Sequence, residues 1–527
     1  MMKNLKNLYI LLVTILMAMP SVSKAYIYDE NGFMYIEHDD LTAAVYNCPD
    51  DVDTLRIPSH VTYNGLTYTV TSIRYIVNPY PSNGIRADDV VHISMPNTIK
   101  TIEDNAFENL YSLRSVDMSN SLTSIGDSAF RSCSLESINI PGTVTSIGRS
   151  AFASCWHLTH MDLSNTSISK IEEDTFWGCM NLESIDLPSS VTTIGRNAFA
   201  ASRLKHIELP EGVTTIGYGA FSDCDSLKSV TLPESLATIM GWAFGYCTAL
   251  QEMFIPRGVN SISPDFIIQC NSIKSLSVDS DNPTYDSRKN CNAIIRTADN
   301  TLIQGSPVTI IPGSVTAVGD WAFWGIDIPA DFIIPNSIRT IEDNAFRGFS
   351  KMTNLILPES VEWIGESSFE SCRSLTSLTL HALLTHIGDK AFYGCQELRN
   401  VKVFHTEPLA IDENVFENKA YQNGTLHVPH GCEDNYKAAN GWKRFSRIIG
   451  DLVIDTPLDV NSDGEIDIAD ANSVIEIIIN GGNSGHTRAP DDDGEIAMGQ
   501  VTGDVNGDGE VNIADFNAVI DRILSGQ

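Results

Sequence analysis

A short sequence pattern repeats along most of this chain and limits what the chain can fold into. It is clearest at residues 182–201, L-E-S-I-D-L-P-S-S-V-T-T-I-G-R-N-A-F-A-A. Each copy carries a phenylalanine, and successive copies lie 22 to 24 residues apart, except for one gap of 57. A fixed period of this length indicates a solenoid, in which each repeat buries its apolar face against its neighbours. The repeat phenylalanines are Phe107, Phe130, Phe152, Phe176, Phe199, Phe221, Phe244, Phe266, Phe323, Phe346, Phe369, Phe392 and Phe416.

The apolar spacing within one repeat predicts one short strand, followed by a second short apolar segment. Ile185 and Leu187 alternate as on one side of a strand. Pro188 then ends the strand, because proline has no backbone N–H to donate. Val191 and Ile194 form a second short apolar segment.

The end of each repeat is predicted to turn and then bury its phenylalanine. Gly195 is expected to take a positive φ where the chain turns. Ala198 and Phe199 then point inward, and one buried phenylalanine removes roughly 150–250 Å² from water. Phenylalanines in register would form a continuous aromatic spine.

These motifs resemble the BspA-like leucine-rich repeats of bacterial surface proteins, with an L-x-x-I-x-[IL]-P and V-T-x-I-G-x-x-A-F-x-x-C signature over roughly residues 90–417. The resemblance implies a β-rich leucine-rich repeat horseshoe with a parallel sheet on its concave face. Such folds display adhesion or recognition surfaces more often than they perform catalysis. The polar strand residues expected to line the concave face are Ser137, Asn139, His160, Asp162, Ser184, Asp186, His206, Glu208, Ser229 and Thr231.

Residues 1–25 have the pattern of a secretory signal peptide. Lys3 and Lys6 precede an apolar run from Leu8 to Met19, and a small-x-small site predicts cleavage after Ala25. A membrane anchor is the alternative, but a span needs about 20 apolar residues. We therefore expect a secreted protein, extracellular or associated with the cell surface, without a membrane span.

Three further segments flank or interrupt the repeats. Residues 26–89 predict an N-terminal β cap made of hairpins, one with an Asn-Gly turn. Residues 284–305 read as a hairpin looped out of one coil, either part of a binding face or a surface decoration. Residues 418–450 resemble the terminal cap of the same repeat family, in which Tyr436, Trp442 and Phe445 would close the core.

The cysteines follow the repeat, which argues against a disulfide framework. Cys133, Cys155, Cys179, Cys224, Cys247, Cys372 and Cys395 lie three residues after a repeat phenylalanine, and Cys270 lies four after. They should therefore stack in one structural position with parallel side chains, which do not face one another as a disulfide requires. Buried free thiols are expected here, while Cys48, Cys291 and Cys432 stay undecided.

The charge of the chain argues against nucleic-acid binding and suggests bound cations near the C-terminus. The net charge is −33, from 67 acidic and 34 basic residues, and no basic stripe suggests nucleic-acid binding. Residues 451–527 hold 17 acidic and two basic residues. This local excess suggests bound cations.

Two loops in that region have the layout of calcium-binding loops. They are D-V-N-S-D-G-E-I-D-I-A-D at 459–470 and D-V-N-G-D-G-E-V-N-I-A-D at 504–515. Oxygen donors fall at positions 1, 3, 5, 9 and 12, with glycine at 6 and a backbone carbonyl at 7. Position 12 is aspartate, and each loop leads into a single amphipathic helix.

This duplicated loop-plus-helix resembles a type I dockerin, the module that plugs proteins into cohesin-bearing scaffolds. The resemblance implies a small α-helical dockerin-like domain over 451–527 that binds two Ca²⁺ ions and a cohesin-type partner. It assigns the calcium ligands to Asp459, Asn461, Asp463, Glu465 (carbonyl), Asp467 and Asp470, and to Asp504, Asn506, Asp508, Glu510 (carbonyl), Asn512 and Asp515. It places the cohesin-facing pairs at Ile468-Ala469 and Ile513-Ala514. Purely structural calcium without a cohesin partner is the alternative.

No paired acid and base, nucleophile elbow, histidine metal pair or phosphate loop stands out in the sequence. Catalytic residues are therefore not predicted, and the chain is interpreted as a non-catalytic recognition protein that binds a protein or glycan ligand. One alternative is an adhesin whose calcium module is a folding device. Another is an accessory component of polysaccharide degradation.

Overall fold

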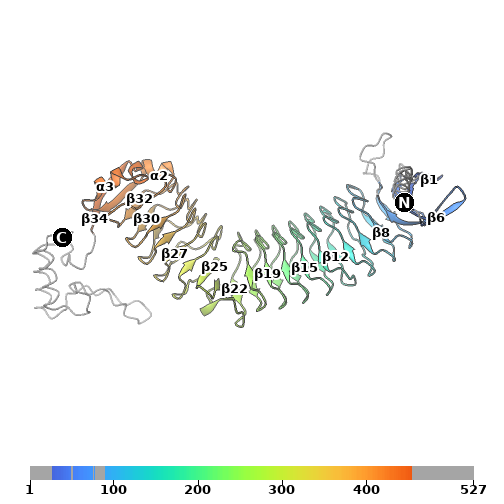
Figure 1. Cartoon of the computed structure of the whole chain (residues 1–527), viewed down its shortest axis with the longest axis horizontal. Helices are drawn as coiled ribbons and strands as arrows, with labels where there is room; N and C mark the ends of the chain where they lie inside the picture. Colours follow the sequence, from blue (N-terminus) through green and yellow to red (C-terminus); the bar gives the residue numbers. More distant parts are fainter. Residues whose placement is uncertain (1–25, 39, 49–51, 75, 77–89, 454–527) are drawn as a thin grey trace, which may run out of the picture. The chain divides into compact units, whose positions relative to one another are not determined.

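A computed structural model describes residues 26–453, apart from 39, 49–51, 75 and 77–89. The predicted signal peptide and, from residue 454 onward, the predicted calcium module lie outside the described residues. The chain divides after Ile333 into two compact units, each described here by itself. In the first unit the coils lie side by side in sequence order (Figure 1). The predicted parallel-sheet solenoid is confirmed.

The first unit begins with hairpins, on which the repeats are built. β1, β2 and β3 pair antiparallel, and β5 and β6 form a hairpin whose turn residues Asn64 and Gly65 have φ of 50° and 78°. β6 then pairs parallel with β8, the first two-residue strand of the repeats. The bounds are β1 (Tyr26–Tyr28), β2 (Met34–Glu37), β3 (Thr42–Asn47), β5 (His60–Tyr63) and β6 (Leu66–Ile73).

The L-x-x-I-x-L segments form strands of three or four residues that pair in parallel between coils. Their central side chain is buried and its neighbours point outward, as at Ile185 between Ser184 and Asp186. In the first unit these strands are β4 (Thr54–Arg56), β7 (His92–Ser94), β9 (Ser115–Asp117), β12 (His160–Asp162), β14 (Ser184–Asp186), β16 (His206–Glu208), β18 (Ser229–Thr231), β20 (Glu252–Ile255) and β22 (Ser275–Val278).

The V-T-x-I segments form a second parallel ladder of two-residue strands. Their register is regular, with Ile194 aligned with Ile216 and Ile216 with Ile239. These strands are β8 (Thr101–Ile102), β10 (Ser124–Ile125), β11 (Ser146–Ile147), β13 (Lys170–Ile171), β15 (Thr193–Ile194), β17 (Thr215–Ile216), β19 (Thr238–Ile239) and β21 (Ser261–Ile262). Most coils therefore contribute a strand to each of two ladders rather than to one.

The segment after β22 is part of the stack rather than a hairpin looped out on the surface. β24 and β25 pair antiparallel, and β25 pairs parallel with β26. Ile294 and Leu302 are fully buried, so the insertion takes a place in the ladder and the core. Its elements are β23 (Tyr285–Asp286), η1 (Arg288–Asn290), β24 (Ile294–Arg296), β25 (Thr301–Gln304) and β26 (Ala317–Val318).

The repeat phenylalanines are buried and stack in runs within each unit. From Phe107 to Phe244, consecutive ring centroids are 4.9 to 5.6 Å apart, and most ring planes are within about 11° of parallel. From Phe346 to Phe416 the separations are 5.3 to 5.6 Å. The backbone joins the same segments, since the Phe199 N–H donates to the Ala220 carbonyl at 2.8 Å.

The backbone of the turn before Phe199 differs from the prediction made for Gly195. Gly195 does not have a positive φ, whereas Asn197, two residues later, has φ of 48°. A Cβ on Gly195 would instead lie 2.7 Å from the carbonyl carbon of Glu172 in the preceding coil. Glycine is therefore needed at this position for close coil-to-coil approach.

The second unit continues the same architecture from residue 334 and ends in short helices. Phe416 packs against Tyr421, Trp442 and Phe445, with centroids 5.4 to 5.9 Å away. Trp442, Tyr436 and Phe445 are buried, which closes this end of the core. The elements are β27 (Thr340–Ile341), β28 (Asn354–Ile356), β29 (Trp363–Ile364), β30 (Ser377–Leu380), β31 (His386–Ile387), β32 (Asn400–Val403), α2 (Asn418–Asn423), β33 (Thr425–Pro429), α3 (Glu433–Ala438), η2 (Trp442–Arg444) and β34 (Arg447–Leu452).

The contact at Gly195 gives a stability prediction. We expect Gly195→Ala to lower the free energy of unfolding by roughly 1–3 kcal/mol, because the added methyl group meets backbone that cannot move aside. Gly313→Ala is the matched control, since no atom lies within 4 Å of its Cβ position. Guanidinium unfolding followed by circular dichroism measures both. Equal midpoints for the two variants would contradict this account of the glycine.

Candidate functional site

The predicted calcium ligands and cohesin-facing pairs lie outside the described residues, so the structure does not test them. Within the described part of the chain, no group of three or more His, Cys, Asp or Glu side chains is arranged to hold a metal ion. None of the described helices has the length and apolar character needed to cross a membrane. The described residues offer three surfaces with functional potential.

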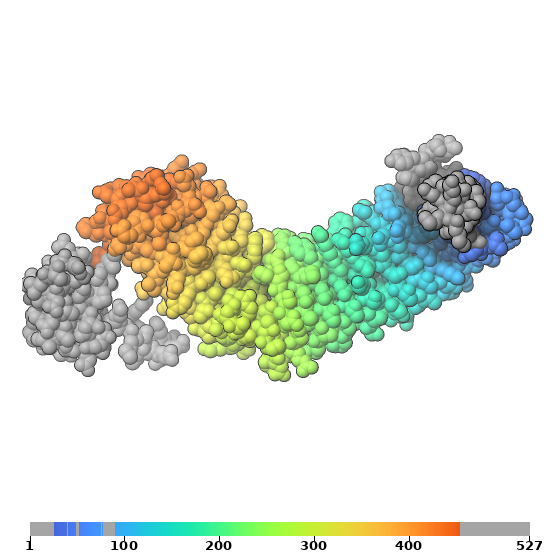
Figure 2. Space-filling model, in the orientation of Figure 1, coloured from blue at the N-terminus to red at the C-terminus, as the bar shows by residue number. Residues whose placement is uncertain are grey.

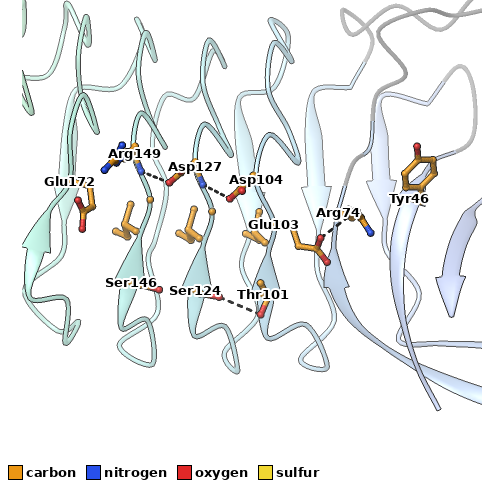
Figure 3. Close-up of a pocket in the computed structure, with 15 residues that line it drawn as sticks. Tyr46, Arg74, Thr101, Glu103, Asp104, Ser124, Asp127, Ser146, Arg149 and Glu172 are labelled. Atoms are coloured by element: carbon orange, nitrogen blue, oxygen red, sulfur yellow. Dashed lines mark hydrogen bonds and ion pairs between the residues drawn. The ribbon is translucent and has the colours of Figure 1, made fainter. Parts of the chain in front are cut away.

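The first surface is an open groove of about 980 Å³ over the two-residue strands β8, β10 and β11, next to Tyr46 on β3 (Figure 3). Its charged lining residues are four carboxylates and two guanidinium groups, so it is net acidic: Glu103, Asp104, Asp127, Glu172, Arg74 and Arg149. The described lining residues include no histidine, cysteine or lysine.

The groove carboxylates hold the coils together. Asp104 Oδ1 accepts the backbone N–H of Asp127 at 2.8 Å, and Asp127 Oδ1 accepts the N–H of Arg149 at 2.7 Å (Figure 3). Glu103 accepts the Ser72 hydroxyl at 3.0 Å and lies 3.7 Å from the Arg74 guanidinium. These side chains therefore have structural partners, and the groove offers a ligand polar contacts without a reactive group.

The second surface is the outer face of the longer strands, where histidines contact the neighbouring coil. His92 Nδ1 lies 2.8 Å from Ser115 Oγ, and His92 Nε2 lies 3.1 Å from Asp117 Oδ2. His160 lies 2.9 Å from the Ser184 hydroxyl in the same way, as His206 does from that of Ser229. All of the sequence-predicted face residues that the strands carry are at least partly exposed.

A serine, histidine and aspartate in contact resemble the components of a hydrolase site, but the arrangement lacks other requirements. An oxyanion needs N–H donors aimed at one point, whereas the backbone here is paired in the β7–β9 ladder. Because the histidine contact recurs on several coils, it is a property of the repeat. The face presents hydrogen-bonding groups in rows, which suits recognition.

The third surface is a group of five aromatic side chains in the first unit, called the aromatic cluster below: Tyr218, Trp242, Tyr246, Trp321 and Trp324. Centroids of contacting rings are 4.8 to 6.4 Å apart. Tyr218 is 43% exposed, and the other four residues are partly exposed. The Arg196 guanidinium carbon lies 5.7 Å from the Tyr218 ring centroid, within cation–π distance.

Three members of the aromatic cluster have an unfavourable backbone conformation. Trp242, Tyr246 and Trp321 have φ of 57°, 60° and 60°. The equivalent positions of other coils carry mostly small or polar residues, such as Asn197 and Ser154. A bulky side chain in this region costs on the order of 1–3 kcal/mol. Sequence reasoning missed this cluster, although aromatic residues two positions before or after a repeat phenylalanine were a visible departure from the pattern.

The predicted stack of repeat cysteines is confirmed: their thiols are buried and form no disulfides. Each thiol donates to the carbonyl of the repeat phenylalanine in the preceding coil, for example Cys179 to Phe152 at 3.1 Å. The same contact, 3.0 to 3.5 Å long, is made by Cys133, Cys155, Cys224, Cys247, Cys270, Cys372 and Cys395. The sulfurs therefore satisfy buried carbonyl groups and are not poised for nucleophilic chemistry.

Burial raises the pKa of the Cys179 thiol to about 12. A folded-state pKa above the unfolded value of about 8.5 stabilises the fold fully below that value, and the stabilisation is lost as the pH rises toward 12. We expect the urea midpoint to fall between about pH 9 and 12, and to fall less steeply in Cys179→Ala, which lacks this thiol. Parallel pH profiles for the two proteins would contradict the assignment.

The fold and its repeats define a leucine-rich repeat solenoid. The chain belongs to the family described as the BspA type leucine-rich repeat region, which it matches over residues 86–203, 169–293 and 307–423. Residues 457–524 match the dockerin type I domain. Both families are typically non-catalytic and extracellular or surface-associated, and type I dockerins generally bind calcium and imply a cohesin partner.

Several solved structures are similar to this chain. A leucine-rich cell surface protein from Faecalibacterium prausnitzii is 24% identical with a TM-score of 0.47, and the match covers 82% of this chain and 100% of that one. A leucine-rich repeat protein from Bacteroides ovatus is 22% identical with a TM-score of 0.40, covering 72% and 94%. The pneumococcal vaccine antigen PcpA is 16% identical with a TM-score of 0.42, covering 82% and 99%. Because these scores are below 0.5, the family assignment rests on the repeats. No curated protein matches the chain.

Proposed function

We propose that this chain is a secreted, non-catalytic recognition protein. Its repeat surface binds a protein or glycan ligand, and its C-terminal module docks with calcium onto a cohesin-bearing assembly. The observation that carries the proposal is the presence of BspA type repeats and a type I dockerin match on one chain. The repeats supply an extended surface, and the dockerin match supplies a means of attachment.

The two loops at 459–470 and 504–515 are proposed to bind one Ca²⁺ ion each. Both lie within the matched dockerin segment. Hard oxygen donors at alternating positions are the ligands that calcium prefers, and the glycine at position 6 permits the sharp bend around the ion. The proposed ligands are the aspartate and asparagine side chains at positions 1, 3, 5, 9 and 12 named above, together with the backbone carbonyls of Glu465 and Glu510 at position 7.

The repeat surface suits recognition because its core is rigid and its outer positions are polar. Strand side chains such as Asp162 and Asp186 are exposed at regular intervals between coils. A surface of this kind keeps its shape when a ligand binds, so little conformational entropy is lost on binding. Extended faces of repeat proteins are binding surfaces in general.

The docking role can be tested by calcium titration of the full chain and by binding to a panel of immobilised type I cohesin domains. We expect two Ca²⁺ ions per chain and a retained complex that EDTA releases. Asp470→Ala should remove one ion and Asp515→Ala the other, because each removes the position-12 carboxylate of one loop. Asp492→Asn, an acidic residue between the loops, is the matched control and should bind both ions.

The identical pairs Ile468-Ala469 and Ile513-Ala514 sharpen this experiment. If either pair can face a cohesin, replacing one pair with charged residues should weaken binding far less than replacing both. Calcium binding without retention by any cohesin would overturn the docking role and leave a structural calcium module. Absence of calcium binding would overturn the proposal for the whole segment.

A further inference from the structure

We propose that the aromatic cluster is a binding site for a neutral, linear polysaccharide. This inference rests on the proposed recognition role of the repeat surface and names its ligand and its location. It is carried by three aromatic residues, Trp242, Tyr246 and Trp321, which occupy left-handed backbone positions and also contact one another directly or through Trp324. Strained conformations persist where function requires them.

Backbone hydrogen bonds between and within coils hold the residues that carry the rings. The backbone N–H of Trp242 donates to Asp265 and that of Tyr246 to Ile268 in the next coil, at 3.2 and 2.8 Å. The backbone N–H of Trp324 donates to the backbone carbonyl of Trp321 at 3.0 Å. A site built on such a scaffold is preorganised, so the binding energy is not spent on ordering side chains.

Trp324 reaches Trp242 because Asn271 fixes the coil that carries it. The Asn271 side-chain amide donates to the Gly325 carbonyl at 3.3 Å, and its oxygen accepts the Asp327 N–H at 2.8 Å. The two segments are more than 50 residues apart in sequence. This clamp brings the Trp324 ring to 6.0 Å from Trp242 and completes the cluster across the intervening coil.

The chemistry of the cluster fits the apolar face of a sugar ring. Aromatic faces carry a negative quadrupole and attract the weakly positive C–H groups of a pyranose. Asp265, whose backbone carbonyl accepts the Trp242 N–H, is partly exposed, and a carboxylate can accept hydrogen bonds from sugar hydroxyl groups.

The acidic residues around the aromatic cluster favour a neutral polysaccharide over an anionic one. Carboxylates border the aromatic cluster in sequence and in the next coils, at Asp223, Asp265, Asp320 and Asp327. The nearby cation, Arg196, lies over Tyr218 and 3.8 Å from Glu173, so its charge is already balanced. An anionic polymer would be repelled, as the net charge of −33 also indicates.

A protein partner fits this surface less well. Specific protein interfaces bury about 800 Å² on each partner and are depleted of charge at their centre. The aromatic cluster has five residues, of which Tyr218 alone is more than about a third exposed, and carboxylates border it. A small patch of rings is better matched in size to a polymer one sugar wide.

Tryptophan fluorescence of the full chain, titrated with cellohexaose, xylohexaose and mannohexaose in EDTA and without cohesin, tests the proposal. We expect saturable binding of at least one hexasaccharide. The variant Trp242→Asn/Trp321→Asn, which installs a residue that other coils carry at this position, should weaken binding at least about tenfold. It should keep or raise the thermal midpoint, because backbone strain is relieved. Isothermal calorimetry reads the affinity of the variant, which has lost two fluorophores.

The matched control is Trp156→Thr, which removes an exposed indole in a distant coil and installs the residue found at Thr248, the equivalent position. Its affinity should stay within about twofold of the parent chain. No binding of the three hexasaccharides, equal binding by both variants, or binding of a proline-rich peptide in their place would each overturn the assignment. Because calcium and cohesin are absent, failure of docking leaves this result unaffected.

Discussion

The structure depends on how each Ala-Phe segment is joined to the coils on either side. The Phe199 N–H donates to the Ala220 carbonyl, while the Phe199 carbonyl accepts the Cys224 thiol at 3.3 Å. The ring meanwhile stacks between Phe176 and Phe221. One residue thus takes part in backbone pairing, side-chain hydrogen bonding and aromatic packing at once. Because the segment must turn sharply on both sides of the ring, a left-handed residue lies two positions before Phe199 and another two positions after it. The repeat period follows from these requirements.

Such a core leaves few positions at which function can vary. The buried positions are constrained by both neighbouring coils, so a change in one coil disturbs three. The outer strand positions and most of the left-handed positions are less constrained, because their side chains are at least partly exposed. The space-filling view shows the surfaces of successive coils in the first unit following one another in sequence order (Figure 2). The proposed recognition role therefore falls on these positions, and Trp242 and Trp321 illustrate how one coil can depart from the repeat pattern there.

Features that recur with the repeat could be predicted from the sequence. Features that depend on a contact between coils could not. The phenylalanines, the cysteine column and the Asn64-Gly65 turn were predictable because each follows from spacing or local backbone preference. The role of Gly195 was not, because the atom that excludes a side chain belongs to Glu172, 23 residues earlier. The two-residue strands were too short to show alternation, so the second ladder was missed. The aromatic cluster depends on the Asn271 clamp, which joins distant segments and leaves no periodic trace. The assignment of residues 457–524 needed only the ligand spacing of the two loops.

The cysteine content of this protein follows from the same core. The position three residues after each phenylalanine must be small, buried and able to donate a hydrogen bond to a carbonyl that the stack leaves partly unsatisfied. A thiol meets all three needs at low desolvation cost. Ser202 occupies this position in one coil, is buried, and lies 3.2 Å from the Cys224 sulfur, so the position selects a small donor rather than sulfur chemistry. A disulfide between neighbouring coils would turn both sulfurs away from their carbonyl partners and leave each oxygen with only the backbone N–H three residues later as its donor. The hydrogen bonds of the column therefore favour the free thiol over a disulfide.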